Sequence, residues 1–412
     1  MAETPKTPLW LGAWASSQAV PAGADALDTA DLHDVTLRQT VHLTAGGSAL
    51  RIKISNALGS EPLHITAAHV ARSLSPATGS IDAATDRPLT FAGNADVTVP
   101  AGAEYLSDPV ALPVSRFADI AVSLHFDAIP AGQTSHIASH QNSFLGHGDQ
   151  TAQADLDGAK KFDHWFFLSG VEVAAAPGTG VVVALGDSIT DGTASTTNGN
   201  DRWPDVLARR LAAAKGMPAL AVLNSGIGGN RILAEGRGPS AMARFTREVL
   251  AQPAIRYLIV LEGINDLRRA DMEPARPASE HEAHVRRILA AYQQIIGQAH
   301  AHGIRVMGAT VTPDLDAVYS QPTVLDRPSA AHEADRQAIN SWIRNSGAFD
   351  TVVDFDAVVR DPQRPDHLLP AFDSGDHIHP NPAGYQAMAE TIPLAFFAGQ
   401  PKHPARHKSK AD

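Results

Sequence analysis

Two polar motifs in the second half of the chain contain residue types that could catalyse acyl transfer. Ser188 closes the motif at residues 186–188, Gly-Asp-Ser, and His379 closes the motif at residues 376–379, Asp-His-Ile-His. A serine hydroxyl needs an adjacent base before it can attack a carbonyl carbon, and an imidazole that titrates near neutral pH can supply that base. Asp376 could orient the imidazole of His379 and stabilise its charged form. We therefore expect Ser188 to be a nucleophile, with His379 and Asp376 completing a catalytic triad.

Two further motifs offer hydrogen-bond donors for the oxyanion that such an attack generates. Residues 224–230 have the sequence Asn-Ser-Gly-Ile-Gly-Gly-Asn, and residues 262–266 have the sequence Glu-Gly-Ile-Asn-Asp. Donors that are held in place before the reaction stabilise the developing negative charge. The candidates are the backbone N–H groups of Ser188 and Gly229 and the side-chain amide of Asn265. Glycine at position 229 would also permit a close backbone approach and unusual dihedral angles.

The elements that must position these motifs are buried strands. Residues 181–185 form an apolar run that is too short for a helix and rich in β-branched residues, which is typical of a fully buried strand. Further strand candidates lie at residues 220–223, 257–261, 304–309 and 352–355. Amphipathic helices alternate with them, which predicts βαβ units and a parallel sheet. Because ligands bind at the carboxyl ends of strands in open α/β sheets, the four motifs would meet at one edge.

Each motif also has an ordinary structural explanation. Ser188 could cap a helix, residues 228–229 could form a tight turn, and residues 265–266 could be a turn pair. His377 and His379 could be surface residues before a helix. Each explanation is reasonable for one motif alone, but together they require four coincidences at corresponding positions of the sheet. The combination therefore favours catalysis.

Other chemistries fit less well. Thr190 stands where the Gly-x-Ser-x-Gly elbow of α/β-hydrolases needs its second glycine, and the P-loop and zinc-binding His-Glu-x-x-His motifs are missing. A flavodoxin-like sheet could hold FMN, but the triad and the oxyanion donors would then be unexplained. His136, His140 and His147 lie in a polar stretch of the first half, where no acidic residue completes a metal-binding signature. We expect them to be loop histidines, some facing a shared cleft, and we expect neither a metal nor a cofactor.

Helix boundaries in the second half have their own signals. Ser279 and Glu282 have the spacing of a capping box, which predicts the start of a helix there. Asn381 followed by Pro382 predicts the start of the last helix, which would run towards Phe397.

The first half of the chain has the pattern of an antiparallel β-sandwich. Apolar and polar residues alternate at residues 50–55 and 120–126, and turn clusters separate such stretches. The small residues, proline and glycine at residues 174–180 indicate a domain boundary. We therefore expect a β-sandwich accessory domain at residues 1–176, a catalytic domain at residues 177–399 and a disordered basic tail at residues 400–412.

Composition narrows the range of partners. The formal net charge of the 412-residue chain is −11, which argues against general affinity for nucleic acid or an anionic membrane. The chain has no cysteine, which excludes disulfides and thiolate catalysis. No apolar run is long enough to span a bilayer, and residues 1–6 lack the regions of a signal peptide.

The second half resembles the SGNH (GDSL-type) serine esterase and lipase family. The similarity lies in four blocks that occur in the family's order, at residues 186–190, 224–230, 263–266 and 376–379. It covers about residues 180 to 398. The resemblance implies a three-layer α/β/α fold with a five-stranded parallel sheet in flavodoxin-like order, and metal-free ester hydrolysis. It places the oxyanion glycine at Gly229. His377 is a second imidazole beside the expected base, and the Asp-x-x-His spacing favours His379.

The first half is similar to the β-sandwich domain, here expected to be jelly-roll-like, that precedes the catalytic domain in some bacterial members of this family. Residues 10–18 and 38–63 carry that similarity. In such proteins the extra domain can form a wall of the active-site cleft or bind carbohydrate. The resemblance also implies a secreted or periplasmic protein, while a cytoplasmic location stays open.

We thus expect a serine hydrolase of short acyl esters, such as acetyl groups on sugars or small alcohols. Two alternatives stay open. The same acyl-enzyme could transfer its acyl group to an alcohol or amine, or the sandwich could bind carbohydrate beside a vestigial hydrolase domain. The expected partner is a small-molecule or carbohydrate ester, and the oligomeric state is open.

Overall fold

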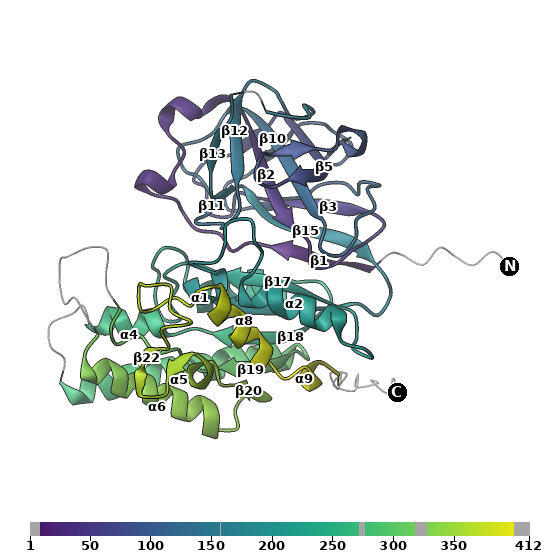
Figure 1. Ribbon diagram of the computed structural model, residues 1–412. Helices are drawn as coiled ribbons and strands as arrows, with labels where there is room; N and C mark the ends of the chain where they lie inside the picture. The colour runs from purple at the N-terminus through teal and green to yellow at the C-terminus, as the bar shows by residue number, and fades with distance from the viewer. Residues whose placement is uncertain (1–8, 157, 272–276, 318–327, 399–412) are drawn as a thin grey trace, which may run out of the picture.

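The computed structural model describes residues 9–156, 158–271, 277–317 and 328–398, with a strand-rich first half packed on a layered second half (Figure 1). The tail predicted at residues 400–412 lies outside the described residues. Within the described ranges, no helix has both the length and the apolar character needed to cross a membrane.

Two antiparallel sheets make up most of the first half, as the alternating pattern predicts. The first sheet has the strand order β1 (Leu9–Ala15), β15 (Leu168–Ala175), β3 (Leu50–Ser55) and β9 (Glu104–Leu106). The second has the order β13 (Lys160–Phe162), β12 (Ser143–His147), β2 (His33–His42), β10 (Asp119–Ala128), β5 (Ala67–Ser75) and β6 (Ser80–Ile81), and β7 (Arg87–Pro88) pairs with β5. Short pairs join β11 (Ser135–His136) to β14 (Trp165–Phe166) and β4 (Leu63–Ile65) to β8 (Val97–Val99). Buried apolar side chains of both sheets share one core.

The outer face of the second sheet is more buried than the sequence pattern suggests. On β10 the apolar residues at 120, 122, 124 and 126 are fully buried, but Ala121 and Ser123 between them are buried as well. Arg38 on β2 explains this burial, because its guanidinium donates to the Ser123 hydroxyl and to the carbonyl of Gln153 (2.8 and 2.7 Å). The chain around Gln153 therefore covers a face that the alternation alone would leave to solvent.

The second half contains the predicted five-stranded parallel sheet. Its strand order is β17 (Leu220–Gly226), β16 (Gly180–Gly186), β18 (Ile255–Leu261), β19 (Arg305–Ala309) and β20 (Thr351–Val353). This is the flavodoxin-like order 2-1-3-4-5, so the first strand, β16, is flanked by β17 and β18. Antiparallel pairing ends at Ala175 and parallel pairing begins at Gly180, whereas the division into separate domains stays a prediction.

Helices connect the strands and cover the parallel sheet, which gives the three-layer α/β/α arrangement (Figure 1). In chain order they are α1 (Ser188–Asp191), α2 (Trp203–Ala213), α3 (Ala241–Phe245), α4 (Ile264–Asp271), α5 (Ala278–Ala301), α6 (Ala330–Asn345), α7 (Phe355–Val359), α8 (Pro382–Thr391) and α9 (Ala395–Ala398). A π-helical turn, η4 (Thr246–Leu250), extends α3. Helices α2 and α8 contact each other, and α5 packs beside α6.

Two helix boundaries differ from the sequence prediction. Helix α5 begins at Ala278 directly after Pro277, so Ser279 lies in its first turn and makes no capping bond. Helix α8 does begin after Asn381, whose side chain accepts the N–H of Gly384 (3.0 Å), but it ends at residue 391. Pro393 explains the early end, because proline has no N–H to continue the helix and disfavours helical dihedrals in the residue before it.

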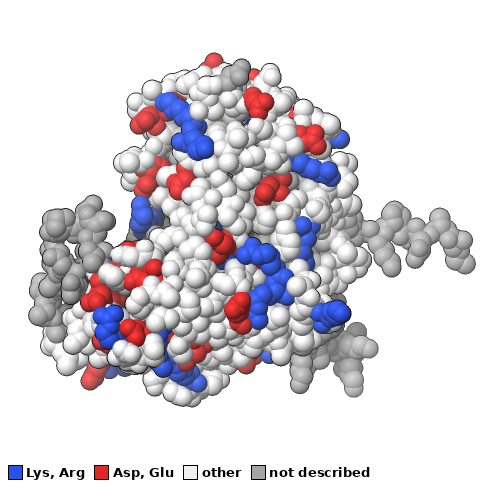
Figure 2. Space-filling model, in the orientation of Figure 1, with Lys and Arg blue, Asp and Glu red and all other residues white. Residues whose placement is uncertain are grey.

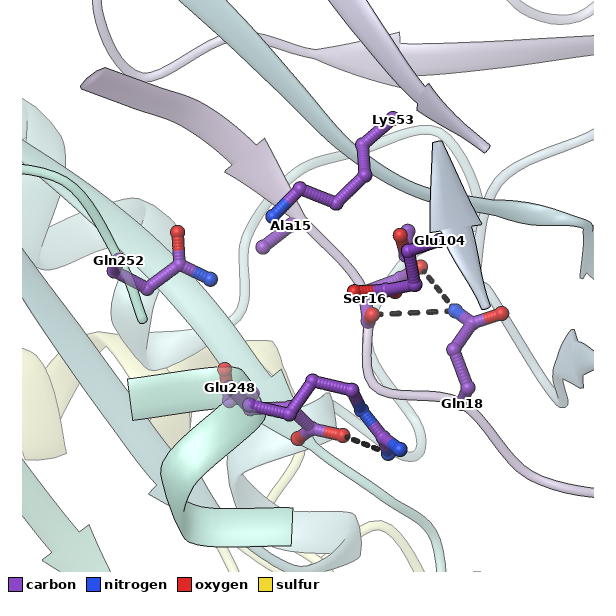
Figure 3. Close-up of a pocket in the computed structure, with 10 residues that line it drawn as sticks. Ala15, Ser16, Gln18, Lys53, Glu104, Glu248 and Gln252 are labelled. Carbon is purple, nitrogen blue, oxygen red and sulfur yellow. Dashed lines mark hydrogen bonds and ion pairs between the residues drawn. The ribbon is translucent and has the colours of Figure 1, made fainter. Parts of the chain in front are cut away.

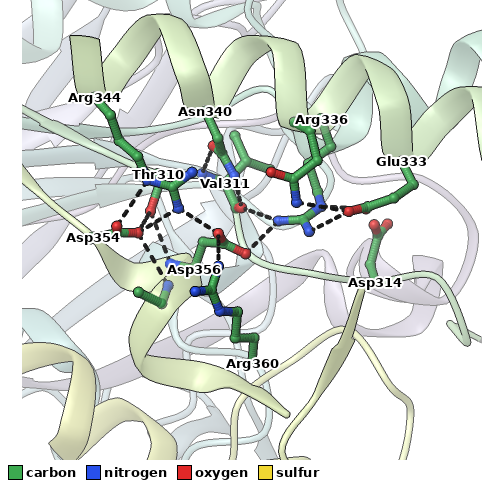
Figure 4. Close-up of polar contacts among 12 residues, drawn as sticks. Thr310, Val311, Asp314, Glu333, Arg336, Asn340, Arg344, Asp354, Asp356 and Arg360 are labelled. Carbon is green, nitrogen blue, oxygen red and sulfur yellow. Dashed lines mark hydrogen bonds and ion pairs between the residues drawn. The ribbon is translucent and has the colours of Figure 1, made fainter. Parts of the chain in front are cut away.

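A buried ionic network holds α6 against the strand ends (Figure 4). The guanidinium of Arg336, which has no exposed surface, donates to the Asp356 carboxylate on α7 (2.7 Å) and to the carbonyl of Val311 (2.8 Å). Arg344 donates to the other oxygen of Asp356 (2.5 Å). Because Val311 follows β19 and Asp356 follows β20, these bonds anchor α6 to the carboxyl edge of the sheet.

The sandwich covers the β17 edge of the parallel sheet. Strand β1 lies beside β17, and a side chain at Gly12 of β1 would come within 2.8 Å of Leu223. The hydroxyl of Thr44 lies 3.0 Å from the backbone nitrogen and 2.8 Å from the backbone oxygen of Val222. An edge strand leaves such groups without partners inside its own sheet. Thr44 therefore satisfies polar backbone groups that the interface buries.

Thr44→Val should destabilise the protein, because it keeps the side-chain shape and removes the hydroxyl from Val222. Leaving buried backbone groups unpaired costs about 1–3 kcal/mol. Chemical denaturation should show this loss in the free energy of unfolding. Thr98→Val, at an exposed position of β8, is the matched control and should change stability by less than about 0.5 kcal/mol. Equal stability of the two variants would contradict the role of Thr44.

Candidate active site

Ser188 lies at the carboxyl end of β16, where the strand turns directly into the short helix α1. The Asp187 carboxylate caps this helix by accepting the N–H of Ile189 (2.9 Å). The turn packs on bare backbone: a Cβ on Gly186 would lie 2.0 Å from the Thr190 hydroxyl, and a Cβ on Gly226 would lie 2.2 Å from the Asp191 nitrogen. Glycine at both strand ends is therefore required for α1 to hold Ser188 in this position.

Ser188, His379 and Asp376 form a continuous hydrogen-bonded chain. The Nε2 atom of His379 lies 2.8 Å from the hydroxyl oxygen of Ser188, and its Nδ1 atom lies 2.6 Å from Oδ2 of Asp376. The other oxygen of Asp376 accepts the backbone N–H groups of Ile378 and His379 (3.0 and 2.8 Å). The carboxylate thus fixes both the ring and the backbone of His379. With Nδ1 donating to Asp376, Nε2 is left to accept the Ser188 hydroxyl proton.

Electrostatics keep Asp376 ionised. Partial burial raises the pKa of its carboxyl group, but the hydrogen bond and the charge of His379, with the two backbone N–H groups, outweigh burial. The net pKa lies well below the ordinary value for aspartate. Asp376 can therefore stabilise a charged imidazole without taking its proton.

His377 makes a second, interleaved pair on the same loop. Its Nδ1 atom lies 2.5 Å from Oδ2 of Asp373, while Oδ1 of Asp373 accepts the backbone N–H groups of Gly375 and His377. His377 has a φ of 65°, a left-handed conformation that is uncommon outside glycine. The structure therefore places His379 against Ser188 and turns His377 towards Asp373.

The three expected oxyanion donors come from neighbouring segments. Gly229 has a φ of 75°, whereas Gly228 beside it does not have a positive φ. Within the described residues, the N–H groups of Ser188 and Gly229 have no acceptor. The Asn265 amide donates to the carbonyl of Asn230 (2.9 Å), which places it beside the Gly229 loop. Because an amide nitrogen carries two hydrogens, one N–H of Asn265 stays available to a ligand.

Two residues to which the sequence analysis gave no catalytic role hold this loop in place. The Asp266 carboxylate accepts the N–H groups of Ile232 and Leu233 (2.8 and 3.0 Å), just beyond Asn230. The fully buried guanidinium of Arg244 donates to the side-chain oxygen of Asn230 (2.8 and 3.0 Å). The position of Asp266 next to Asn265 was a usable signal. Arg244 gives no local signal, because it is one arginine in an ordinary helical stretch.

Asp191 and His136 make another contact with the loop. Oδ2 of Asp191 accepts the N–H of Gly228 (3.1 Å), and Oδ1 lies 3.0 Å from Nε2 of His136. His136 was expected to be a loop histidine of the first half, and it is instead fully buried against α1. Among the residues that the structure describes, no group of three or more His, Cys, Asp or Glu could hold a metal ion.

Buried carboxyl groups surround the end of β16. Burial is the main cause that raises the pKa of Asp187 to about 7 and of Asp266 to about 6, and it raises the pKa of Glu262 well above its ordinary value. Their negative charges also repel one another, and the charge of Arg244 offsets this only in part. At neutral pH, part of this group is therefore protonated.

A cavity of about 300 Å³ borders the loop that carries the two histidine–aspartate pairs. Polar side chains from three stretches of the chain line much of it, including Arg364, His367, Asp373 and His377. Leu368 and Pro370 contribute apolar surface. The cavity is thus suited to a ligand with several polar groups.

Asp187→Asn should flatten the pH dependence of stability between about pH 4 and pH 7. A carboxyl whose pKa is raised on folding holds a proton that the unfolded chain releases, so it lowers stability as the pH rises through this window. Asparagine keeps the bond to the Ile189 N–H and cannot ionise. The slope of the free energy of unfolding against pH should differ from that of the wild type by up to about 1.4 kcal/mol per pH unit. Chemical denaturation at a series of pH values measures this slope. Asn345→Ala, at an exposed position without an ionisable group, is the control and should leave the slope unchanged. Equal slopes for Asp187→Asn and the wild type would contradict the prediction.

Comparison with known proteins identifies a family for the second half of the chain. Residues 184–387 match the GDSL-like Lipase/Acylhydrolase family. No curated protein matches the chain. Similar solved structures include a GDSL-like lipase from Bacteroides thetaiotaomicron (19% identity, 52% of this chain and 86% of that chain, TM-score 0.37). An M. smegmatis aryl esterase (14% identity, 51% and 95%, TM-score 0.39) and the acetyl xylan esterase AlAXEase (18% identity, 52% and 97%, TM-score 0.35) are also similar. Through residues 184–387, the chain belongs to the GDSL-like lipase/acylhydrolase family and is a carboxylic ester hydrolase.

Proposed function

We propose that this hydrolase cleaves esters of short acyl groups, with Ser188 as its nucleophile. The observation that carries the proposal is the hydrogen-bonded chain from the Ser188 hydroxyl through His379 to Asp376. Such a chain meets the geometric requirement for a nucleophile and its base, which must lie about 2.6–3.2 Å apart. The same intact chain argues against a vestigial domain.

In the first step, Nε2 of His379 takes the hydroxyl proton of Ser188 while the serine oxygen attacks the ester carbonyl carbon. Asp376 holds the imidazolium that forms. His379 then gives the proton to the departing alcohol, and an acyl group stays on Ser188. Water, activated by His379 in the same way, releases the acid and restores the serine. An alcohol in place of water would give acyl transfer by the same steps.

The oxyanion of each tetrahedral intermediate would be bound by the N–H groups of Ser188 and Gly229 and by the Asn265 amide. The two backbone groups have no acceptor among the described residues, so they need no rearrangement to receive the charge. The Asn265 amide is held beside them through the Asn230 carbonyl. The positive φ of Gly229 sets the direction of the backbone between Gly228 and Asn230.

The cavity beside the catalytic loop favours a polar alcohol as the other part of the ester. Arg364 and Asp373 offer charged groups to hydroxyls, whereas both ring nitrogens of His367 already contact carboxylates. Asp373 also fixes the ring of His377. A long acyl chain would need a mainly apolar surface. We therefore propose acetylated sugars or similar acetylated polyols as substrates. Acidic and basic side chains are interspersed on the face of the protein that Figure 2 shows.

Ser188→Ala should abolish hydrolysis of p-nitrophenyl acetate, with a fall in kcat of about a thousand-fold or more. Asn265→Ala should lower kcat by about 100- to 1,000-fold, because one oxyanion donor is lost. Asn345→Ala, at an exposed site on α6, is the control and should keep full activity. Acetate should be preferred over butyrate and octanoate. Unchanged kcat in Ser188→Ala would refute the assignment of Ser188 as the nucleophile.

His377→Asn should weaken binding of an acetylated sugar without changing the chemistry. Asparagine tolerates the left-handed backbone at this position but does not reach as far as the imidazole. Loss of one hydrogen bond should raise KM for an acetylated monosaccharide about five-fold, while kcat for p-nitrophenyl acetate stays the same. Steady-state kinetics on both substrates measure this. An equal fall in kcat for both would show that His377 takes part in the reaction itself.

A further inference from the structure

His136 reaches from the sandwich into the catalytic half of the protein. It lies on the two-residue strand β11, its ring is tilted against Trp165 (ring centroids 5.3 Å apart), and only 3% of its surface is exposed. Nδ1 lies 2.7 Å from the carbonyl oxygen of Ser17, and Nε2 lies 3.0 Å from Oδ1 of Asp191. One ring thus joins a loop of the sandwich to the helix that begins with Ser188.

These two contacts determine where protons must be. The Ser17 carbonyl can only accept, so Nδ1 of His136 must carry a hydrogen. An ionised Asp191 can also only accept, so Nε2 must carry a hydrogen as well. The His136–Asp191 pair therefore holds one more proton than a neutral imidazole beside a carboxylate. Without that proton, two lone pairs would face each other in a buried site.

Asp191 also binds the oxyanion loop, residues 228–230. Its second oxygen accepts the N–H of Gly228, the residue before Gly229 (3.1 Å). Asp191 is also three residues after Ser188, in the last position of α1. The chain from His136 through Asp191 to Gly228 therefore sets the distance between the nucleophile's helix and the loop that offers the Gly229 N–H.

Ser17 provides a second connection on the other side of the loop. Its hydroxyl donates to Glu248 (2.6 Å) and accepts from Arg244 (3.0 Å), which in turn binds the Asn230 side chain. Figure 3 shows the neighbouring residues Ser16 and Gln18 bonded to each other, with Glu248 on the opposite side of the pocket. Both ends of the segment from Gly228 to Asn230 are thus held through the same part of the sandwich.

The groups around His136 have opposing effects on its pKa. Burial lowers the pKa of His136, but the charge and hydrogen bond of Asp191 and the Ser17 carbonyl outweigh it, so the net pKa is raised. The nearby charge of Arg202 opposes protonation. His140 also faces this group, and burial lowers its pKa to about 4, so it adds no positive charge near neutral pH.

We propose that protonated His136 is a positioning residue of the esterase, which holds the oxyanion loop through Asp191 and releases it when the proton is lost. The inference rests on the proposed function of Ser188 and Gly229. It makes the sandwich part of the catalytic machinery. Because the His379 base must be neutral to work, activity rises with pH at the acid side, and loss of the His136 proton then lowers it at the alkaline side.

Asp191→Asn is the decisive variant. Its amide can donate to Nε2 of a neutral His136, and its oxygen can still accept the Gly228 N–H, so the connection is kept without the extra proton. We expect kcat for p-nitrophenyl acetate at neutral pH to stay above that of His136→Ala, and the kcat profile to lack the alkaline decline. His136→Ala should lower kcat about ten-fold or more with little change in KM. His69→Gln removes a histidine–aspartate pair elsewhere in the sandwich (2.8 Å) and is the control. It should change neither kcat at neutral pH nor the alkaline decline.

An alkaline decline in Asp191→Asn equal to that of the wild type would overturn the proposal, and so would full kcat in His136→Ala. If His136→Ala does not fold, the Asp191→Asn profile decides alone. Amide hydrogen exchange at Gly228 gives a readout that does not need activity. At alkaline pH it should be faster in the wild type than in Asp191→Asn at the same pH, and equal rates would also refute the proposal. If the exchange difference appears but the wild type hydrolyses no ester, the proposed function fails and the proton-dependent connection stands.

Discussion

The buried guanidinium of Arg244 is the interaction on which most of the site depends. It has no exposed surface, and it donates to the carbonyls of Gly186 and Ser225 at the ends of two adjacent strands (2.9 and 2.7 Å). It also binds the Asn230 side chain and Glu248. A buried charge is costly unless each of its donors has a partner, and here the partners are the segments that carry Ser188 and the oxyanion loop. Any displacement of those segments would leave part of this charge unpaired.

The same burial explains why the carboxyl groups nearby are weaker acids than usual. Asp187 caps the helix of Ser188, and Asp266 holds the loop after Asn230, so both must accept N–H groups inside the protein. Three carboxylates and one guanidinium cannot all be charged there at low cost, and the pKa values of Asp187, Asp266 and Glu262 are raised accordingly. Asp376 has the opposite property, because His379 faces it directly. The site thus contains buried carboxyl groups with raised pKa values and one carboxyl group, beside the imidazole, with a lowered pKa.

The interface with the sandwich is built from the same kind of bonds. Thr44 satisfies the edge of β17, and Ser17 and His136 reach the residues that hold the oxyanion loop. These are polar contacts made by buried side chains, so they depend on exact positions more than apolar packing does. The first half of the chain therefore contributes to the geometry around Ser188 as well as to the burial of the sheet.

The amino-acid sequence was sufficient to predict an antiparallel first half, a parallel sheet in the second half and the residues able to do acyl chemistry. Apolar runs such as residues 181–185 and the spacing from Asp376 to His379 act over a few residues, so they are visible without a fold. The alternation of strands and helices also predicted that the four motifs lie at one edge of a parallel sheet. Local signals were less reliable at helix ends, where Pro277 and Pro393 decided the boundaries.

Contacts between residues far apart along the chain became visible in the folded protein. His136 and Asp191 are 55 residues apart, and Ser17 and Arg244 are 227 residues apart. No periodicity links such pairs, because their contact depends on how two halves of the chain pack. The Asp-x-x-His spacing already favoured His379 over His377, but the physical reason for that choice lies in the folded loop. Both have an aspartate at helical spacing, and only the backbone of the folded loop, with its left-handed turn at His377, aims one imidazole at Ser188.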